Sequence, residues 1–229
     1  MEHLLIFNLA VDEDDTVLGF TSAWIRALAQ KAKSVCVITM RTGRFNLPNN
    51  VQVCSVGKEK GYNDIQRTFE FYRCLFKVLR TQNITACFSH MMPLFSAMAG
   101  PILRAYHIPL VTWYAHPQLT GTLKLAHYMS NRMVASVATA YPYHHDKLTV
   151  IGQGIDTELF SPGEATYSNE QAIILCAGRI SRVKDHMTLI KAVALLKERM
   201  KKPFQIVILG DPLGIDGQVY KAELENQIT

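Results

Sequence analysis

Short apolar segments alternate along the first 150 residues with longer amphipathic segments. The apolar segments are β-branched, bounded by polar turns and typical of buried strands. They are His3–Ala10, Ser34–Met40, Val51–Val56, Thr85–Ser89, Ile108–Tyr114, Val134–Val137 and Leu148–Ile151. Between them, apolar residues recur at helical spacing, as in the stripe of Phe69, Tyr72, Leu75, Phe76 and Leu79. This alternation predicts parallel strands joined by helical crossovers, and therefore a doubly wound α/β sheet.

The same pattern restarts after a polar, turn-rich segment at Gly152–Pro162. The second part predicts strands at Ala172–Ala177 and Phe204–Leu209, a helix at Lys184–Met200, a loop at Gly210–Gly217 and a helix from Gln218 onward. We therefore expect two Rossmann-like units, residues 1–157 and residues 158–229, with the linker at the start of the second. Two strands and two helices enclose less core than the first unit, so we interpret the second unit as incomplete.

The uncharged segment Ile84–Leu103 is long enough for a membrane span. It contains His90, Pro93 and the pair Gly100-Pro101, which favour a strand, a break and a buried helix. Acidic residues from Asp12 onward follow too soon after the start for an export signal. We therefore expect neither a span nor a signal peptide.

Charge and cysteine usage narrow the class of protein. The net charge of +5 is spread along the chain, which favours anionic partners and does not indicate nucleic acid. Cys36, Cys54, Cys87 and Cys176 lie in apolar, strand-like runs, so we interpret them as reduced core thiols of a cytoplasmic protein. Metal ligation is the alternative for these cysteines, but no C-x-x-C pair supports it.

The segment C-A-G-R-I-S-R-V-K-D is the strongest chemical signal. A strand ends, Gly178 turns the chain, and Arg179 and Lys184 flank the predicted start of a helix. Ligands of doubly wound sheets bind beyond the carboxyl ends of the strands, and a helix N-terminus favours phosphate. Two cations there suit a diphosphate, with arginine as a fork and lysine as a point charge. The alternative is a pair of solvated surface cations.

Several segments in sequence resemble one family. They are I-G-Q-G-I-D-T-E-L-F-S-P, I-L-C-A-G-R-I-S-R-V-K-D, A-V-A-L-L-K-E-R, V-I-L-G-D-P-L-G and Y-K-A-E-L. Together they resemble the retaining glycosyltransferases of family 4, which have the two-domain GT-B fold. The resemblance implies transfer of a sugar from a nucleotide-sugar donor to an acceptor, with retention at the anomeric carbon. It assigns Arg179 and Lys184 to the donor diphosphate. Gly154 and Asp156 match the family's N-G-V-D linker at the cleft between domains, whereas Gln153 departs from it.

The resemblance implies two further positions in the first unit. Gly19 is the only glycine in the turn that approaches the donor phosphates in the family; the alternative is an ordinary helix start. His116 lies where the family places a catalytic histidine beside the sugar, although a lone histidine after a strand is often just a satisfied polar residue. His90 ends a strand in a similar way and is a weaker candidate. His144 and His145 are interpreted as surface residues.

Other parts of the family's donor site are missing from the sequence. The family carries an E-x7-E segment that contacts the donor sugar and ribose, and the spacing of Glu223 and Glu225 does not match it. The chain is therefore interpreted as an incomplete glycosyltransferase, with a non-catalytic nucleotide-diphosphate-sugar binding module or an inactive remnant as the alternative. A nicotinamide-dependent dehydrogenase is excluded because no G-x-G-x-x-G follows the first strand.

The acceptor is the least defined partner. The resemblance allows a carbohydrate or a lipid-linked acceptor, and a peripheral contact with the inner face of the membrane. The cationic helix between Arg67 and Arg80 is the only sequence feature that favours a lipid. A solvated helix face is the simpler explanation of those cations.

Overall fold

The computed structural model describes residues 2–163, 172–199 and 203–228. The chain separates into two units, Met1–Ile155 and Asp156–Thr229, and each is described by itself. Residues 151–163, which include the boundary between the units, are exposed throughout.

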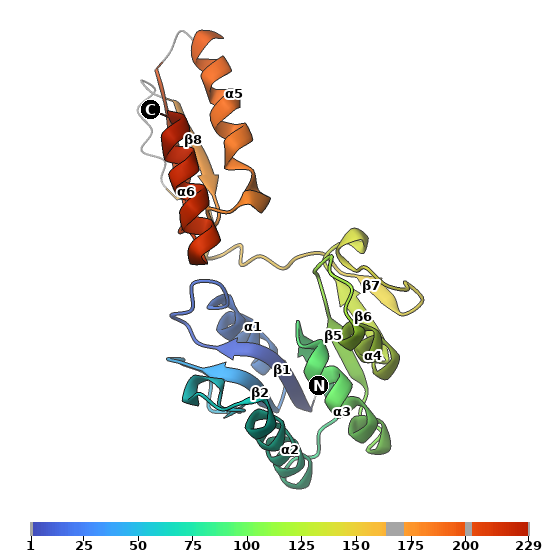
Figure 1. Ribbon diagram of the computed structural model, residues 1–229. Coiled ribbons are helices and arrows are strands. Elements are labelled where there is room, and N and C mark those ends of the chain that lie inside the picture. Colours follow the sequence, from blue (N-terminus) through green and yellow to red (C-terminus); the bar gives the residue numbers. More distant parts are fainter. Residues whose placement is uncertain (1, 164–171, 200–202, 229) are drawn as a thin grey trace. The chain divides into compact units, whose positions relative to one another are not determined.

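A seven-stranded sheet forms the centre of the first unit (Figure 1). Its strands, in chain order, are β1 (His3–Val11), β2 (Ser34–Thr42), β3 (Val51–Ser55), β4 (Ala86–His90), β5 (Leu110–Trp113), β6 (Arg132–Ala135) and β7 (Leu148–Val150). The order in the sheet is β3-β2-β1-β4-β5-β6-β7, and every pair is parallel. The predicted doubly wound sheet is confirmed. Its order reverses between β1 and β4, the place where such sheets bind ligands at their carboxyl edge.

Helices cover both faces of this sheet (Figure 1). They are α1 (Phe20–Ala29), α2 (Asp64–Thr81), α3 (Pro93–Ala105) and α4 (Gly121–Met129), with short 3-10 turns at Lys58–Lys60 and Ala138–Ala140. Side chains of α1 pack with β1 and β2 in one cluster, and side chains of α2 and α3 pack in a second, larger one. The segment Ile84–Leu103 lies mainly in β4 and α3, and none of the described helices is long and apolar enough to cross a bilayer.

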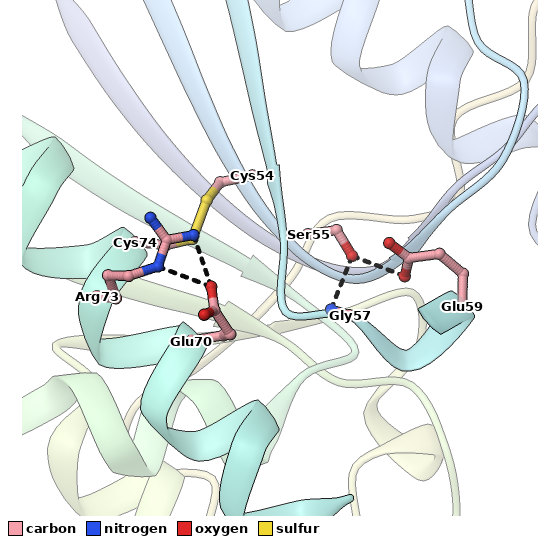
Figure 2. Close-up of a disulfide and its surroundings, with 7 residues drawn as sticks. All are labelled: Cys54, Ser55, Gly57, Glu59, Glu70, Arg73 and Cys74. Atoms are coloured by element: carbon pink, nitrogen blue, oxygen red, sulfur yellow. Dashed lines mark hydrogen bonds and ion pairs between the residues drawn. A yellow bond between two sulfur atoms is a disulfide. The ribbon is translucent and has the colours of Figure 1, made fainter. Parts of the chain in front are cut away.

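One disulfide corrects the expectation for the cysteines. Figure 2 shows Cys54 of β3 joined to Cys74 of α2, whose Cα atoms lie 6.3 Å apart. Cys36, Cys87 and Cys176 are free thiols, as predicted. Cys54 was expected to be reduced because it lies in an apolar, strand-like run. The pairing arises because the buried side of α2 packs on the edge strand β3.

The second unit has two parallel strands and two helices in its described residues. They are β8 (Ala172–Ala177), a 3-10 turn at Arg182–Lys184, α5 (His186–Arg199), β9 (Phe204–Leu209) and α6 (Gly214–Ile228). Ile180, Tyr220 and Leu224 form its buried cluster, against which Met187 and Ile190 pack. Both strands lie where the sequence predicts them.

Both helices of the second unit begin elsewhere than predicted. Helix α5 begins at His186 rather than Lys184, because Asp185 adopts a left-handed conformation that interrupts the helix. Helix α6 begins at Gly214, inside the predicted loop Gly210–Gly217. Met200, the predicted last residue of α5, lies outside the described residues.

Candidate functional site

Two glycine turns lie side by side at the carboxyl ends of β8 and β9. Gly178 and Gly210 have φ angles of 151° and 154°, a region that side-chain-bearing residues rarely adopt. The amide of Gly178 donates to the Leu209 carbonyl at 2.9 Å, so strand pairing continues past both strand ends. A Cβ on residue 210 would lie 2.1 Å from the Gly178 oxygen. The two turns are therefore held in contact by backbone alone.

Three cations lie on the turn that follows β8, and they have different environments. Arg182 pairs with Glu223 at 2.5 Å and stacks over the Tyr220 ring at 5.1 Å. Arg179 and Lys184 are exposed and pair with no carboxylate among the residues that the structure describes. The side chain of Lys184 extends over Gly178, where an added Cβ would meet its Cε at 3.5 Å. The two predicted residues are thus the two cations left available for an anion.

The first turn of α5 differs from the predicted phosphate site. The Asp185 carboxylate accepts a hydrogen bond from the amide of Thr188 at 3.3 Å. The amide of Met187 donates to the Tyr220 hydroxyl at 3.1 Å. Two of the amides that would otherwise favour phosphate are therefore already bonded within the unit. An anion at this turn would therefore be held mainly by Arg179 and Lys184.

A second candidate region lies in the first unit, at the carboxyl edge where the strand order reverses. His90 ends β4 and is buried against aromatic rings, with centroids 4.6 Å from Trp24 and 6.2 Å from Trp113. Burial lowers the pKa of His90 from 6.5 to about 4, so its imidazole is neutral at physiological pH. The adjacent cavity has a volume of about 10 Å³, room for one water at most. His90 is therefore part of a packed aromatic cluster.

His116 lies just beyond β5 at the same edge of the sheet. It is exposed, and its Nδ1 accepts a hydrogen bond from the amide of Gln118 at 3.2 Å. This bond places the ring proton on Nε2 and leaves Nε2–H as a donor. His116 has the accessibility that a catalytic group needs, and its catalytic role stays a prediction.

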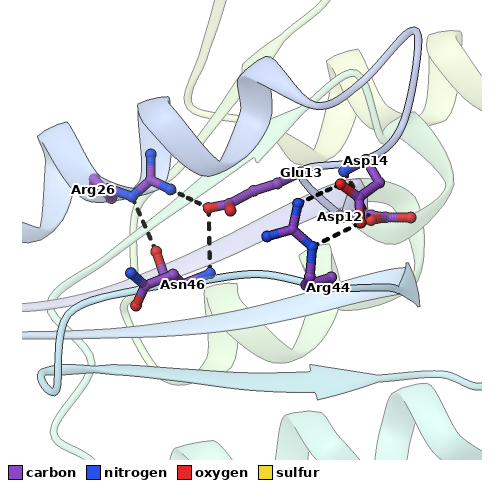
Figure 3. Close-up of polar contacts among 6 residues, drawn as sticks. All are labelled: Asp12, Glu13, Asp14, Arg26, Arg44 and Asn46. Carbon is purple, nitrogen blue, oxygen red and sulfur yellow. Dashed lines mark hydrogen bonds and ion pairs between the residues drawn. The ribbon is translucent and has the colours of Figure 1, made fainter.

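The loop between β1 and α1 is tied to its neighbours by arginines. Figure 3 shows Glu13 bonded to Arg26 and Asp14 bonded to Arg44, whose Nε donates to Asp14 Oδ2 at 2.8 Å. The hydrogen bond from Arg44 lowers the pKa of Asp14. Asp15 pairs in the same way with Arg41.

Gly19 closes this acidic loop. Its amide donates to the Asp15 carbonyl at 3.0 Å, and an added Cβ would lie 2.8 Å from that oxygen. Packing of the loop on itself is therefore sufficient to require glycine here. Its predicted contact with donor phosphate stays a prediction.

The linker residues have local roles. Asp156 Oδ1 accepts hydrogen bonds from the amides of Glu158 and Leu159 at 3.1 and 3.0 Å, which stabilises a turn. For Gly154, no atom of the residues that the structure describes lies within 4 Å of an added Cβ. The cleft contacts implied for both residues stay predictions.

Sequence reasoning missed three residues that define the two regions. Arg182 was not distinguished from its neighbours, because its partner Glu223 lies 41 positions away. Trp24 and Trp113 were not assigned to a site, although both contact His90. The signal in the sequence was partial, because Trp113 ends a strand whereas Trp24 lies within α1. Within the described residues, no group of three or more acidic, histidine or cysteine side chains could hold a metal ion.

Comparison with known proteins gives a family match for the second unit. Residues 161–229 match the family model described as "Glycosyl transferases group 1". Among curated proteins, none matches the sequence.

Solved structures show the same fold over the whole chain. Anabaena HepE, solved in complex with UDP, has a TM-score of 0.71 at 15% identity and is matched over 100% of this chain and 65% of its own. A glycosyltransferase from Rickettsia africae has a TM-score of 0.67 at 14% identity, over 99% and 65% of the two chains. The UDP-GlcNAc 2-epimerase of Methanocaldococcus jannaschii has a TM-score of 0.55 at 11% identity, over 98% and 69%. This chain thus spans about 65% of the length of the first two, and the fold is of the GT-B, Rossmann-like type.

Proposed function

We propose that this chain belongs to a glycosyltransferase that moves a sugar from a nucleotide-sugar donor to an acceptor with retention. The observation that carries the proposal is the pair Arg179 and Lys184. Both are exposed and without an ion-pair partner in the described residues. They lie beside the joined glycine turns, inside the segment that matches the glycosyl transferase family.

The fold alone does not decide the reaction. Structures that share it include a glycosyltransferase and a nucleotide-sugar epimerase. The family match over residues 161–229 favours transfer. A phosphate-binding turn is also what transfer needs, because its leaving group is a nucleoside diphosphate.

In this proposal the protein lowers the barrier by electrostatic stabilisation. Negative charge grows on the leaving diphosphate as the bond to the sugar breaks, and Arg179 and Lys184 stabilise that charge. His116 donates from Nε2 to the reacting sugar and orients it. These cations supply the positive charge that a metal ion supplies in other transferases, so the proposal includes no metal and no cofactor.

The donor, the acceptor and the cellular location are proposed only by class. HepE was solved with UDP and with UDP-glucose, so a uridine donor is the first to test. The acceptor is a carbohydrate or a lipid-linked carbohydrate, and nucleic acid is not expected. A cytoplasmic location, at the inner face of the membrane, rests now on three free thiols rather than four. The alternative is a binding module without catalysis, in which the same two cations would bind the diphosphate.

Calorimetry on the full chain tests the proposal through the donor diphosphate. We expect UDP and ADP to bind with similar, modest affinity, because the contacts are to phosphate. Arg179→Ala and Lys184→Ala should each weaken binding by about tenfold or more, since a hydrogen bond to a charged group contributes roughly 1.5–3 kcal/mol. Added salt should weaken it too.

Lys197→Ala is the matched control, because Lys197 is an exposed cation at the far end of α5. It should leave affinity unchanged. Equal losses in all three variants would indicate diffuse charge attraction and contradict the assignment. One combination of results would favour the binding module instead. Both site variants would abolish UDP binding, and the complete protein would transfer no sugar from any UDP-sugar.

A further inference from the structure

Helix α2 has large apolar side chains on the side that faces away from the sheet. Its buried side consists of Phe71, Cys74, Leu75 and Val78. At 100° per residue, the opposite side carries a different set. We call this set the outer face of α2: Ile65, Gln66, Phe69, Arg73, Phe76, Lys77 and Arg80.

The apolar members of the outer face are accessible. Ile65 is 82% exposed, Phe69 69% and Phe76 37%. Single exposed apolar residues are normal, but three on one face of one helix form a patch that indicates an interaction surface. The patch borders a hollow of about 610 Å³, lined by Phe69, Tyr72, Phe76 and the nearby cations.

The charged members of the outer face are all cations. Arg73 is held by Glu70 on the same helix at 2.6 Å (Figure 2). Lys77 and Arg80 are exposed, and neither pairs with a carboxylate in the described part of the chain. The outer face therefore combines exposed rings with two uncompensated positive charges.

We propose that the outer face of α2 docks on a membrane surface that contains anionic lipid. Helices that lie in the bilayer interface place aromatic and aliphatic side chains at the boundary of headgroups and acyl chains. Lysine and arginine beside them extend to lipid phosphates. This inference goes beyond sugar transfer and does not require it.

Charge argues for a bilayer rather than a second copy of the chain. A two-fold symmetric dimer through this face would place the same positive patch against itself. The face belongs to a single helix of 18 residues, and Phe69 and Phe76 line a hollow together with the cations Arg73, Lys77 and Arg80. An anionic surface complements this positive charge.

Docking through this face has a consequence for the first unit. Helix α2 follows β3 and a 3-10 turn, so its first residue, Asp64, lies toward the carboxyl edge of the sheet. Ile65 and Phe69 are in its first two turns. A membrane contacted by these residues would lie near the edge that carries His90 and His116.

Flotation of the full chain with phospholipid vesicles, without any nucleotide, tests this inference. We expect binding to phosphatidylcholine vesicles that contain phosphatidylglycerol, weak binding to phosphatidylcholine alone, and loss of binding with added salt. Lys77→Gln/Arg80→Gln should reduce partitioning by roughly tenfold or more, from the attraction of each cation to anionic lipid. Phe69→Ser/Phe76→Ser should reduce it by a similar factor through lost apolar insertion.

The matched control is Lys191→Gln/Lys197→Gln, which removes the same charge from exposed positions on α5. It should bind as the unchanged protein does, and circular dichroism should show all variants folded. Equal binding to both kinds of vesicle, or equal losses in both charge variants, would overturn the inference. Sedimentation as a dimer that the Phe69→Ser/Phe76→Ser variant abolishes, with no vesicle binding, would also overturn it. Because no donor is present, the result is independent of the proposed sugar transfer.

Discussion

Arg182 and Lys184 lie two positions apart on one turn, and their surroundings give them different roles. Glu223 and the Tyr220 ring hold Arg182, so this cation stabilises the junction of the turn with α6. Lys184 extends over Gly178 and is not engaged by a described carboxylate. The sequence could mark the turn as cationic, but it could not show which cation α6 neutralises. That depends on a contact between residues 41 positions apart.

The surroundings of His90 likewise could not be predicted from the sequence. Its position at a strand end suggested a binding role, and the structure surrounds it with Trp24, Trp113 and Phe20. Burial then determines its chemistry, because the charged form of the imidazole loses hydration. A strand-end position is visible in the sequence, whereas the depth of burial is not.

The lowered pKa of His90 predicts a pH dependence of stability. The unfolded state binds a proton near pH 6.5 and the folded state near pH 4, so stability should fall as the pH falls through this window. The full shift corresponds to about 3 kcal/mol. Urea unfolding between pH 7 and pH 4 should show this loss, and His90→Gln should reduce it.

Burial also lowers the pKa of His127. The His90→Gln variant should therefore keep part of the dependence of stability on pH. Asp14 and Asp15, whose pKa values are lowered from 3.8, contribute only at lower pH. An identical slope in the variant and in the unchanged protein would contradict the assignment to His90.

At the scale of elements, the strands could be predicted better than the helix starts. Strands β8 and β9 were predicted with their observed bounds, because each is an apolar run that ends at a glycine of positive φ. Helix α5 was predicted two residues early. Asp185 there takes a left-handed conformation and caps the helix. The neighbouring residues Lys184 and His186 do not predict this backbone conformation.

The disulfide is the element contact that sequence reasoning missed. Cys54 and Cys74 lie on a strand and a helix 20 positions apart, and only the packing of α2 on the sheet edge brings them together. A crosslink across a loop of this length stabilises the folded state by about 3 kcal/mol in the chain-entropy account. It also fixes α2, whose outer face we propose to contact lipid, to the edge strand.

Reduction therefore should destabilise the first unit. We expect a reductant to lower the urea midpoint of the unchanged protein and to leave that of Cys54→Ala/Cys74→Ala unaffected, since this variant has no crosslink to lose. Under denaturing, non-reducing conditions a thiol assay should detect the three free cysteines. Detection of five thiols, or an equal response to reductant in the variant, would show that the bond does not form.

At the scale of the whole molecule, the two units differ in how fully they bury apolar surface. The first has clusters on both faces of its sheet, which include the fully buried Phe7, Phe71 and Leu75. Among its described residues, the second has one cluster of three buried residues. On its sheet, Ile173 is 58% exposed, Leu175 60% and Leu209 61%. Such a sheet gains less from burial and presents apolar side chains and strand edges to solvent.

Limited proteolysis of the 229-residue chain should reflect the difference in apolar burial between the two units. Residues 151–163 are exposed throughout, so the first cut should fall there and release the first unit intact. The second unit should then be degraded faster, because it opens at a smaller free-energy cost. Mass spectrometry of the products gives the cut sites, and a chain ending at Ile155 should unfold in urea at the midpoint of the first unit in the longer chain. Second-unit peptides that survive as long as those of the first would show that the exposed sheet face does not weaken the unit, and the argument from burial would fail.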